Sequence, residues 1–230
     1  MRNKNAEDFY SIEKIGILYN SEKLINLLLN NIKFEILNVK KNEYLIKENT
    51  DNEFIYYTKK GLLSMKKEKY IIDFFSSGEF VGLSELFMGT KSIMEISAIT
   101  DSELIRFKKA DVISKVLSYQ EGYFYYLYNM NQMMRKVFQK QENLMMTAEK
   151  RVVLSLVKLI ERFGEKTTQG FLLPKEFTNK LISEYVQCHL TTMLYIFKNL
   201  QASGAILSAY KPYMYDLEKL RSLENELVTN

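Results

Sequence analysis

The stretch FTNKLISEYVQCHLTTMLYIFKNLQASGAI, residues 177–206, decides the fold because its apolar residues fit two short helices joined by a tight turn. Thr178 is a suitable N-cap for the first helix, since its hydroxyl can accept a hydrogen bond from a free backbone N–H. A break at 187–188 precedes a second helix over about 189–203, which Gly204 ends. This is the pattern of a helix-turn-helix that leaves one face of its second helix free for a partner. The side chains expected to be buried are Leu181, Ile182, Tyr185, Val186, Met193, Ile196, Phe197 and Leu200.

Residue by residue, this stretch resembles the DNA-binding element of the Crp/Fnr family of bacterial transcription regulators. The family pattern aligns without a gap, and the positions that match it are Thr178, Ile182, Val186, Thr192, Met193, Phe197, Leu200, Gly204 and Ile206. The base-reading positions differ. Where the family has Arg-Glu-Thr and a further Arg one turn later, this chain has Leu190, Thr191, Thr192 and Tyr195. Arg reads guanine and Glu accepts from cytosine, so we expect a DNA site unlike the family's usual one.

The composition limits the possible classes of protein. The chain of 230 residues is long enough for one large or two small domains. No apolar run approaches the roughly 20 residues that span a bilayer, and the first residues lack a signal-peptide core, so a cytoplasmic protein without membrane contact is expected. One Cys and one His argue against a disulfide framework, a metal site or a bound cofactor. There is no phosphate-binding loop, dinucleotide fingerprint or nucleophile elbow, which argues against an enzyme.

Positive charge is concentrated around the helix-turn-helix, although the net charge of the chain is only +4. Between residues 150 and 211 there are nine Lys or Arg and four Glu. A phosphate backbone would lie along such a surface. An ordinary solvated face has the same composition, so the charge count alone favours neither interpretation.

Residues 34–107 have the character of a β-domain. Short apolar and aromatic runs alternate with polar or Gly-containing turns, which is typical of a barrel or sandwich. Gly61, Gly78 and Gly82 stand in turns where a positive φ is expected. The stretch GEFVG at 78–82 also resembles a signature of the Crp/Fnr sensor β-roll. The resemblance thus covers about residues 33–216 and implies an α+β fold. One or two helices are expected in the first thirty or so residues, before the β-roll. The runs expected to form strands include FEILNV, EYLIKE, FIYYTKK, YIIDFF and ELIRF.

The region that resembles a cyclic-nucleotide pocket lacks the residues that would hold the ligand. In the family, Gly-Glu-Leu supplies a carboxylate for the ribose, and a later Arg-Ser pair binds the cyclic phosphate. Here Gly82 is followed by Leu83, so the carboxylate is missing unless Glu85 takes its place. Lys91 and Ser92 stand near the position of the Arg-Ser pair, and Lys91 is better explained as a loop lysine than as a phosphate clamp. We expect no useful affinity for a cyclic nucleotide, as in the PrfA-like branch that this pocket resembles.

A long helix is expected over residues 120–147, which contain no Pro. An apolar stripe along it is what a dimerisation helix needs. Packing within one subunit would require the same stripe, but the length of the helix and the family resemblance favour a homodimer. The residues predicted to pair with a second copy are Phe124, Leu127, Met134, Val137 and Phe138.

The segment YFYYLYNMNQMM, residues 123–134, has more aromatic side chains than one helix face can bury. Such a surface could line a pocket for an apolar or thioether-like effector, because Met adapts its shape easily. Close packing of the helix against the β-roll is the simpler interpretation and is preferred. The candidate pocket residues are Gly82, Leu83, Ser84, Ser92, Tyr123, Tyr126 and Met130.

The residues after the second helix resemble the wing of a winged helix. Residues 205–209 and 213–216 alternate like two short strands, and Lys211 at the tip would contact phosphate without reading sequence. A final helix is expected over 217–230.

At the start of the second helix of the helix-turn-helix, His189 either contacts phosphate or simply faces solvent. Cys188 is either a small turn residue or a thiol whose pKa is lowered by the helix N-terminus; for both residues the structural interpretation is preferred.

The first hypothesis is therefore a homodimeric transcription regulator that binds double-stranded DNA at a near-palindromic, A/T-rich site. It would consist of a sensor domain (1–119), a dimerisation helix (120–147) and a winged helix-turn-helix (148–230). RNA polymerase is a further partner that the resemblance implies, and any small-molecule effector is unidentified. The alternative is a ligand-binding or protein-interaction module that has lost specific DNA binding, because both recognition arginines are missing. The predicted DNA contacts are Thr178, His189, Leu190, Thr191, Thr192, Tyr195, Lys198 and Lys211.

Overall fold

The computed structural model describes residues 12–119, 121–208 and 211–229. It divides into two compact units, which are described separately. The N-terminal unit comprises the described residues up to Glu68 together with Ile72–Phe138, and the C-terminal unit comprises Lys69–Ile71 and the described residues from Gln139 onward. The expected α+β fold is confirmed.

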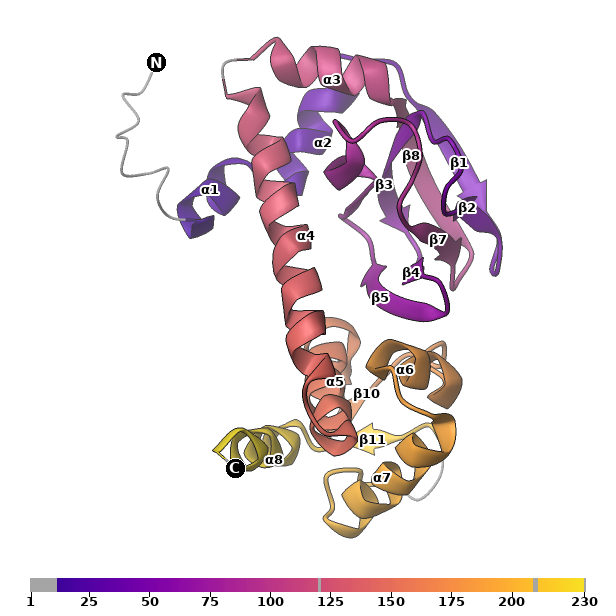
Figure 1. Ribbon diagram of the computed structural model, residues 1–230, viewed down its shortest axis with the longest axis vertical. Coiled ribbons are helices and arrows are strands. Elements are labelled where there is room, and N and C mark those ends of the chain that lie inside the picture. The colour runs from indigo at the N-terminus through magenta and orange to yellow at the C-terminus, as the bar shows by residue number, and fades with distance from the viewer. Residues whose placement is uncertain (1–11, 120, 209–210, 230) are drawn as a thin grey trace. The chain divides into compact units, whose positions relative to one another are not determined.

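The N-terminal unit contains a β-roll of two four-stranded antiparallel sheets (Figure 1). One sheet has the strand order β1-β8-β3-β6 and the other β2-β7-β4-β5. Five strands coincide with the predicted apolar runs, whereas β4, β6 and β7 lie outside them. The strands are β1 (Glu35–Val39), β2 (Tyr44–Ile46), β3 (Phe54–Lys60), β4 (Leu63–Lys67), β5 (Tyr70–Phe75), β6 (Phe80–Val81), β7 (Glu95–Ala98) and β8 (Ser102–Lys108).

The turns of the roll use glycine where the sequence predicts it. Gly61, Gly78 and Gly82 all have positive φ, at 108°, 91° and 82°. At Gly61 a Cβ atom would also lie only 2.1 Å from the Ser102 hydroxyl oxygen. A side chain is therefore excluded at this turn both by the backbone conformation and by the lack of space.

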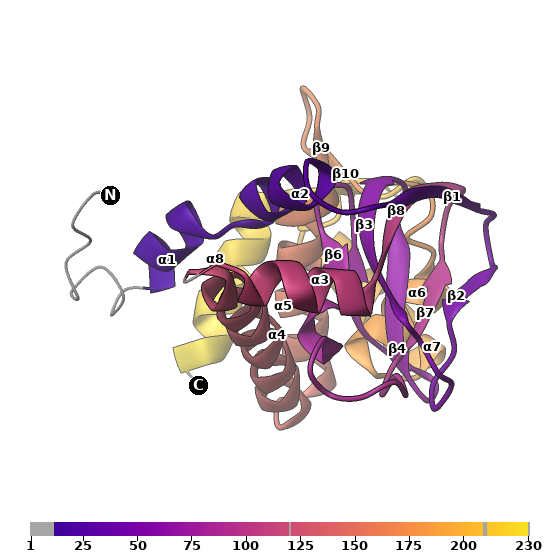
Figure 2. The same ribbon diagram turned by 90° about the horizontal axis from the view of Figure 1, so that it is seen from above.

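Helices cover the first sheet and share a core with it (Figure 2). Helix α2 starts at the N-cap Asn20, whose side chain accepts from the Lys23 N–H, and its apolar positions at helical spacing place Leu24 and Leu28 against the sheet. A second cluster, which includes Ile46, Met65 and Leu104, fills the roll between its two sheets. The helices of this part are α1 (Ile12–Leu18), α2 (Ser21–Leu29), the short η2 (Leu83–Glu85), α3 (Lys109–Leu117) and α4 (Gly122–Leu144).

The C-terminal unit is a winged helix. Its central helix α5 is capped by Thr147, whose hydroxyl accepts from the Lys150 N–H, and it buries an almost continuous apolar face. A three-stranded sheet with the order β11-β10-β9 lies beside the helices. The hairpin of β9 and β10 was not predicted, because strands of two residues carry no periodicity. The elements are α5 (Ala148–Phe163), β9 (Glu165–Lys166), β10 (Phe171–Leu172), α6 (Asn179–Val186), α7 (Leu190–Ala202), β11 (Met214–Tyr215) and α8 (Leu217–Thr229).

The predicted wing is confirmed in the described residues. The Leu207 N–H donates to the Met214 carbonyl at 2.8 Å, and the Asp216 N–H donates to the Ala205 carbonyl at 3.0 Å. The predicted wing residues 209–210 lie outside the described part of the chain. The predicted C-terminal helix corresponds to α8 and the predicted long helix to α4.

Candidate functional site

Helices α6 and α7 form the predicted helix-turn-helix, and local interactions define its turn. The Thr178 hydroxyl accepts from the Leu181 N–H at 3.2 Å, so Thr178 acts as the N-cap of α6. Gln187 ends α6 in a left-handed conformation with φ of 59°, and His189 is the N-cap of α7 without a side-chain capping bond. The chain thus reverses within three residues.

One face of α7 is buried and fixes the orientation of the helix. Met193, Ile196, Phe197 and Leu200 are all at most 4% exposed, as the sequence predicts. The Phe197 ring also packs edge-on against Tyr213, with ring centroids 5.4 Å apart. Because this face is held by the core, the opposite face of α7 points outward.

The outward face of α7 carries most of the predicted DNA contacts. Tyr195 is 66% exposed and Leu190 is 41% exposed. Leu194 is also exposed and was not predicted, although its position one turn after Leu190 indicates that it shares the same face. The exposed predicted contacts of this element and its N-cap are His189, Leu190, Thr191, Thr192, Tyr195 and Lys198.

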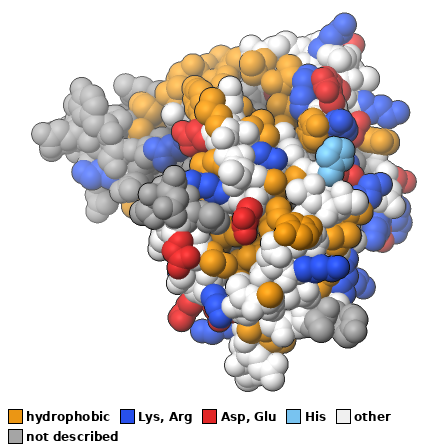
Figure 3. All heavy atoms as spheres, turned by 60° about the horizontal axis from the view of Figure 1, so that its bottom comes forward, with side chains coloured by type: hydrophobic (Ala, Val, Ile, Leu, Met, Phe, Trp, Pro, Cys, Tyr) orange, Lys and Arg blue, Asp and Glu red, His pale blue; other side chains and the backbone are white. Residues whose placement is uncertain are grey.

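The charge on this face is weakly positive. Helix α7 contains one lysine, Lys198, and no acidic residue, and Lys211 of the wing is exposed. Figure 3 shows hydrophobic side chains among Lys and Arg on a face that includes the single histidine. A surface of this kind can accept a polyanion without a strong electrostatic field.

Two basic side chains, one buried and one half-buried, hold the end of α6 and were not predicted. Lys140 donates to the Tyr185 carbonyl, and its Nζ lies 3.7 Å from the centroid of the Tyr185 ring. Arg151 donates to the carbonyls of Met146, at 2.8 Å, and Gln187, at 3.4 Å. These cations satisfy carbonyls that the end of a helix leaves open. Arg151 was counted as part of the positive surface, but its guanidinium is used inside the unit.

The pKa expected for Cys188 is corrected by the structure. Burial raises the pKa of the Cys188 thiol, and the charge of Arg151 opposes this only in part. The thiol is therefore protonated at neutral pH, and the suggested lowering by the helix N-terminus is wrong. The raised pKa agrees with the preferred description of Cys188 as a small turn residue.

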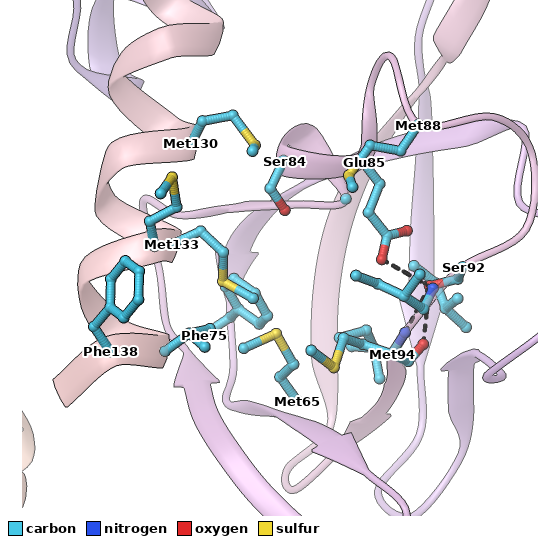
Figure 4. A pocket seen from close by; sticks show the side chains of 16 residues that line it. Met65, Phe75, Ser84, Glu85, Met88, Ser92, Met94, Met130, Met133 and Phe138 are labelled. Carbon is cyan, nitrogen blue, oxygen red and sulfur yellow. Dashed lines mark hydrogen bonds between the residues drawn. The ribbon is translucent and has the colours of Figure 1, made fainter. Parts of the chain in front are cut away.

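A cavity of about 270 Å³ lies within the N-terminal unit, between the β-roll and α4 (Figure 4). Six of the eleven methionines of the chain line it. Glu85 is the one ionisable side chain among the sixteen lining residues. These residues are Ile46, Met65, Phe75, Gly82, Ser84, Glu85, Met88, Ser92, Ile93, Met94, Ile96, Met130, Met133, Met134, Val137 and Phe138.

Four of the seven predicted pocket residues line this cavity, namely Gly82, Ser84, Ser92 and Met130. Leu83 and Tyr126 are instead buried in the core shared by the helices and the sheet. Tyr123 is 46% exposed and packs against Phe87 and Tyr126. For these aromatic side chains, the preferred interpretation of packing within the unit is confirmed.

Glu85 occupies the position that the sequence left open for a shifted carboxylate. It is 6% exposed, and its Oε1 accepts from the Ile93 N–H at 3.2 Å and lies 3.2 Å from the Ser92 hydroxyl. Its Oε2 is buried and has no hydrogen-bond partner among the described residues. Oε1 of this carboxylate thus holds the adjacent loop, whereas Oε2 makes no hydrogen bond with the described residues.

No positively charged group of the described residues takes the place of a phosphate clamp. Arg106 uses Nε and Nη2 to bind Glu35 Oε2, at 2.8 and 2.5 Å, and its guanidinium stacks over Phe54. Lys91 is exposed in a loop and does not line the cavity. The cavity therefore presents a carboxylate and thioethers where a cyclic phosphate would need a cation.

An ion-pair cluster fixes α4 beside this cavity. The Lys136 ammonium lies 2.6 Å from Asp73 Oδ2 and 3.6 Å from Glu79 Oε1. Asp73 is on β5, so the cluster connects α4 with the β-roll. Of the five predicted dimer residues, Phe124 stacks on Tyr19 inside the unit and Leu127 is half-buried. The last three, Met134, Val137 and Phe138, are exposed by 38–58%.

The fold and these two sites define a structural class, a β-roll followed by a winged helix-turn-helix. Residues 36–119 match the family model described as Cyclic nucleotide-binding domain. No curated protein sequence matches the chain.

Solved structures extend the likeness to most of the chain. FixK2 from Bradyrhizobium japonicum has a TM-score of 0.72 at 17% identity and covers 84% of this chain and 98% of its own. The c-di-GMP responsive global regulator CLP from Xanthomonas campestris has a TM-score of 0.69 at 16% identity, with coverage of 85% and 99%. TTHA1359, a transcriptional regulator of the CRP/FNR family from Thermus thermophilus, has a TM-score of 0.66 at 18% identity, with coverage of 84% and 100%. Residues 36–119 are thus similar to a cyclic nucleotide-binding domain, and the chain has the fold of the CRP/FNR regulators.

Two further features are absent from the described residues. No helix among them is both long and apolar enough to cross a membrane. No group of three or more His, Cys, Asp or Glu side chains in the same residues could hold a metal ion.

Proposed function

We propose that the chain is a homodimeric, sequence-specific DNA-binding transcription regulator whose sensor domain does not bind a cyclic nucleotide. The observation that carries this proposal is the outward face of α7, which exposes hydroxyl, aromatic and lysine side chains and no carboxylate. Such a protein acts on DNA in the cytoplasm and has no catalytic activity. Membership of the PrfA-like branch remains a prediction.

The side chains of this face favour recognition of A·T pairs. The hydroxyls of Thr191 and Thr192 can bond base edges or phosphate, and Leu190 and Tyr195 can contact the methyl group of thymine. Lys198 and Lys211 would hold the phosphate backbone without reading sequence. In a homodimer, two copies of α7 would enter major grooves about one turn, roughly 34 Å, apart and recognise a near-palindrome.

Selection of binding sites from random DNA tests this function directly. We expect enrichment of an A/T-rich near-palindrome, which footprinting then confirms as a protected site. If no sequence is enriched even at low salt, specific DNA binding is excluded. Contact with RNA polymerase is a further part of the proposal, tested by transcription from a promoter that carries the selected site.

Replacing Tyr195 with alanine is expected to weaken binding to the selected site by about tenfold, or about 1.4 kcal/mol, because an apolar contact with a base is lost. Affinity for unrelated DNA should change little. Lys198→Ala is the matched comparison on the same helix face, and it should weaken both affinities alike and reduce the salt dependence by about one phosphate contact. Equal losses on both DNAs for Tyr195→Ala would show that Tyr195 does not read sequence.

The second candidate function is a protein-interaction module. The observation in its favour is the exposure of apolar side chains on and near α7, since Leu190 and Leu194 are 41% and 37% exposed and Leu207 is 46% exposed. Exposed apolar patches often mark protein-binding surfaces. Absence of an enriched DNA sequence in the selection experiment would favour this function.

We expect no micromolar binding of cAMP or cGMP to the purified protein by isothermal titration calorimetry. The anionic phosphate would enter a cavity whose only charged lining group is the Glu85 carboxylate, and like charges in a poorly hydrated site repel. A micromolar dissociation constant for either nucleotide would contradict this prediction and restore the usual ligand class of the domain.

A further inference from the structure

We propose that the cavity between the β-roll and α4 binds a small apolar amine, with the ammonium group at Glu85 and the hydrocarbon body among the methionines. This inference rests on the proposed function of the N-terminal unit as a sensor. It assigns a chemical class of ligand to the cavity, opposite in charge to a cyclic nucleotide.

The shape and lining of the cavity fit an apolar molecule. Its volume of about 270 Å³ is lined by residues from β2, β4, β5 and β7, from η2 and the segments beside it, and from α4. Methionine side chains from both the roll and the helix point into the same space (Figure 4). Flexible thioethers adapt to ligands of different outline, and a few polar groups then determine orientation.

Glu85 supplies the polar group. A buried carboxylate oxygen without a donor destabilises a protein, because it has lost its hydrogen bonds to water. Glu85 Oε2 is in this state among the described residues, whereas Oε1 is satisfied by Ser92 and Ile93. Oε2 has almost no accessible surface in this structure, so neighbouring side chains such as the flexible methionines must shift before a ligand N–H can reach it. The contact would then be a charge-assisted hydrogen bond, one of the strong types in proteins.

Lys109, a buried cation whose charge interacts with Glu85, does not fill this role. Lys109 is 7% exposed, and its ammonium donates to the Gly89 carbonyl at 3.5 Å. Burial, the larger effect, lowers the pKa of Lys109, while the charge of Glu85 raises it. Lys109 therefore interacts with Glu85 electrostatically, whereas its ammonium donates a hydrogen bond to the Gly89 carbonyl.

A purely structural role for Glu85 is the alternative. The bonds from Oε1 hold the segment 92–93 beside η2, and they would do so without any ligand. This role requires that the oxygen Oε1 accepts hydrogen bonds, but it does not require the negative charge of the Glu85 carboxylate. Replacing Glu85 by Gln keeps an acceptor and removes the charge, so it separates the two roles.

The test uses three probes with one carbon skeleton and different head groups: phenylpropylamine, phenylpropanol and phenylpropionate. Their binding to the full chain is measured by isothermal titration calorimetry without DNA. We expect the amine to bind most tightly, the alcohol at least tenfold more weakly, and the carboxylate not measurably. In Glu85→Gln the amine should lose at least tenfold in affinity while the alcohol changes less than threefold.

Two further variants serve as controls. Glu95→Gln removes a carboxylate from β7 that does not line the cavity, and it should leave the affinity for the amine unchanged. Met130→Trp should fill the cavity from α4 and abolish binding of both amine and alcohol. Circular dichroism melting verifies that each variant is folded. If Glu85→Gln does not fold, Met130→Trp still tests whether the probes bind in this cavity.

The outcomes separate this inference from the proposed function. Equal affinity of amine and alcohol, preference for the carboxylate, unchanged amine binding in Glu85→Gln, or failure of all three probes would each overturn the assignment of an amine. None of these results depends on DNA. Conversely, if the chain binds the amine but selects no DNA sequence, the ligand assignment stands. The proposed function as a sequence-specific DNA-binding regulator is then overturned.

Discussion

Phe197→Ala is expected to destabilise the C-terminal unit by about 3–5 kcal/mol and to abolish specific DNA binding. The Phe197 side chain is 2% exposed on the inner face of α7, and its ring packs edge-on against Tyr213 near the wing. Truncation removes a large buried apolar area and leaves a cavity that the rigid surroundings fill only in part. A loss of this size is a large share of the stability of a small domain, which is about 5–15 kcal/mol in total.

Urea denaturation followed by circular dichroism measures this effect, with the transition of the C-terminal unit analysed separately from that of the β-roll. Leu194→Ala is the matched control, because it truncates an exposed apolar residue of the same helix. Its effect should stay within about 0.5–1 kcal/mol. If both variants unfold at the same urea concentration, the buried and exposed faces of α7 have been assigned incorrectly.

The helix-turn-helix could be predicted from the sequence because its determinants are local. Thr178 caps α6, and the buried residues of α7 recur at helical spacing. Gly204, with φ of 76°, stands one residue beyond the C-cap of α7. Each of these features depends on residues within a turn or two of one another.

The features that the sequence did not predict depend on contacts between distant segments. Lys140 and Tyr185 are 45 residues apart, and Arg151 and Gln187 are 36 residues apart. Nothing in the local pattern around these basic residues distinguishes a buried donor from a charge on the surface. The same holds for the thiol of Cys188, since only the surrounding structure shows that burial raises its pKa.

The cavity was predicted in part for a related reason. Residues of the GEFVG region and Met130 could be recognised from motif and composition. The opposite wall includes Ile46, Met65 and Ile96, whose inward direction follows from the pairing of β2, β4 and β7. Strand register is a long-range property, and a shift by one residue would turn these side chains outward.

The cavity and the predicted dimer surface share three side chains of α4. Met134, Val137 and Phe138 line the cavity and are also partly exposed. If a second copy packs on this stripe, a ligand in the cavity and the partner helix act on the same residues. Such shared contacts are the physical basis for coupling between two binding events.

Phe138→Glu is expected to convert a dimer into a monomer and to weaken binding to the selected DNA site by at least about 100-fold. The Phe138 side chain is 58% exposed in the single chain, so a charge there is tolerated by the monomer. In the proposed dimer the charge would be buried at an apolar helix pair without a partner, which costs several kcal/mol. The DNA effect follows because two linked recognition helices bind two half-sites far more tightly than one helix binds one.

Sedimentation velocity measures the oligomeric state, and fluorescence anisotropy with the selected DNA measures affinity. Gln139→Glu is the matched control, since it adds the same charge at the adjacent exposed position, where Lys158 Nζ lies 3.5 Å from the Gln139 side-chain oxygen. It should remain dimeric and bind DNA as the unmodified chain does. A Phe138→Glu protein that is still dimeric would show that the exposed stripe of α4 is not the interface. A monomer with undiminished affinity would show that one winged helix is sufficient, and the near-palindromic site would have to be abandoned.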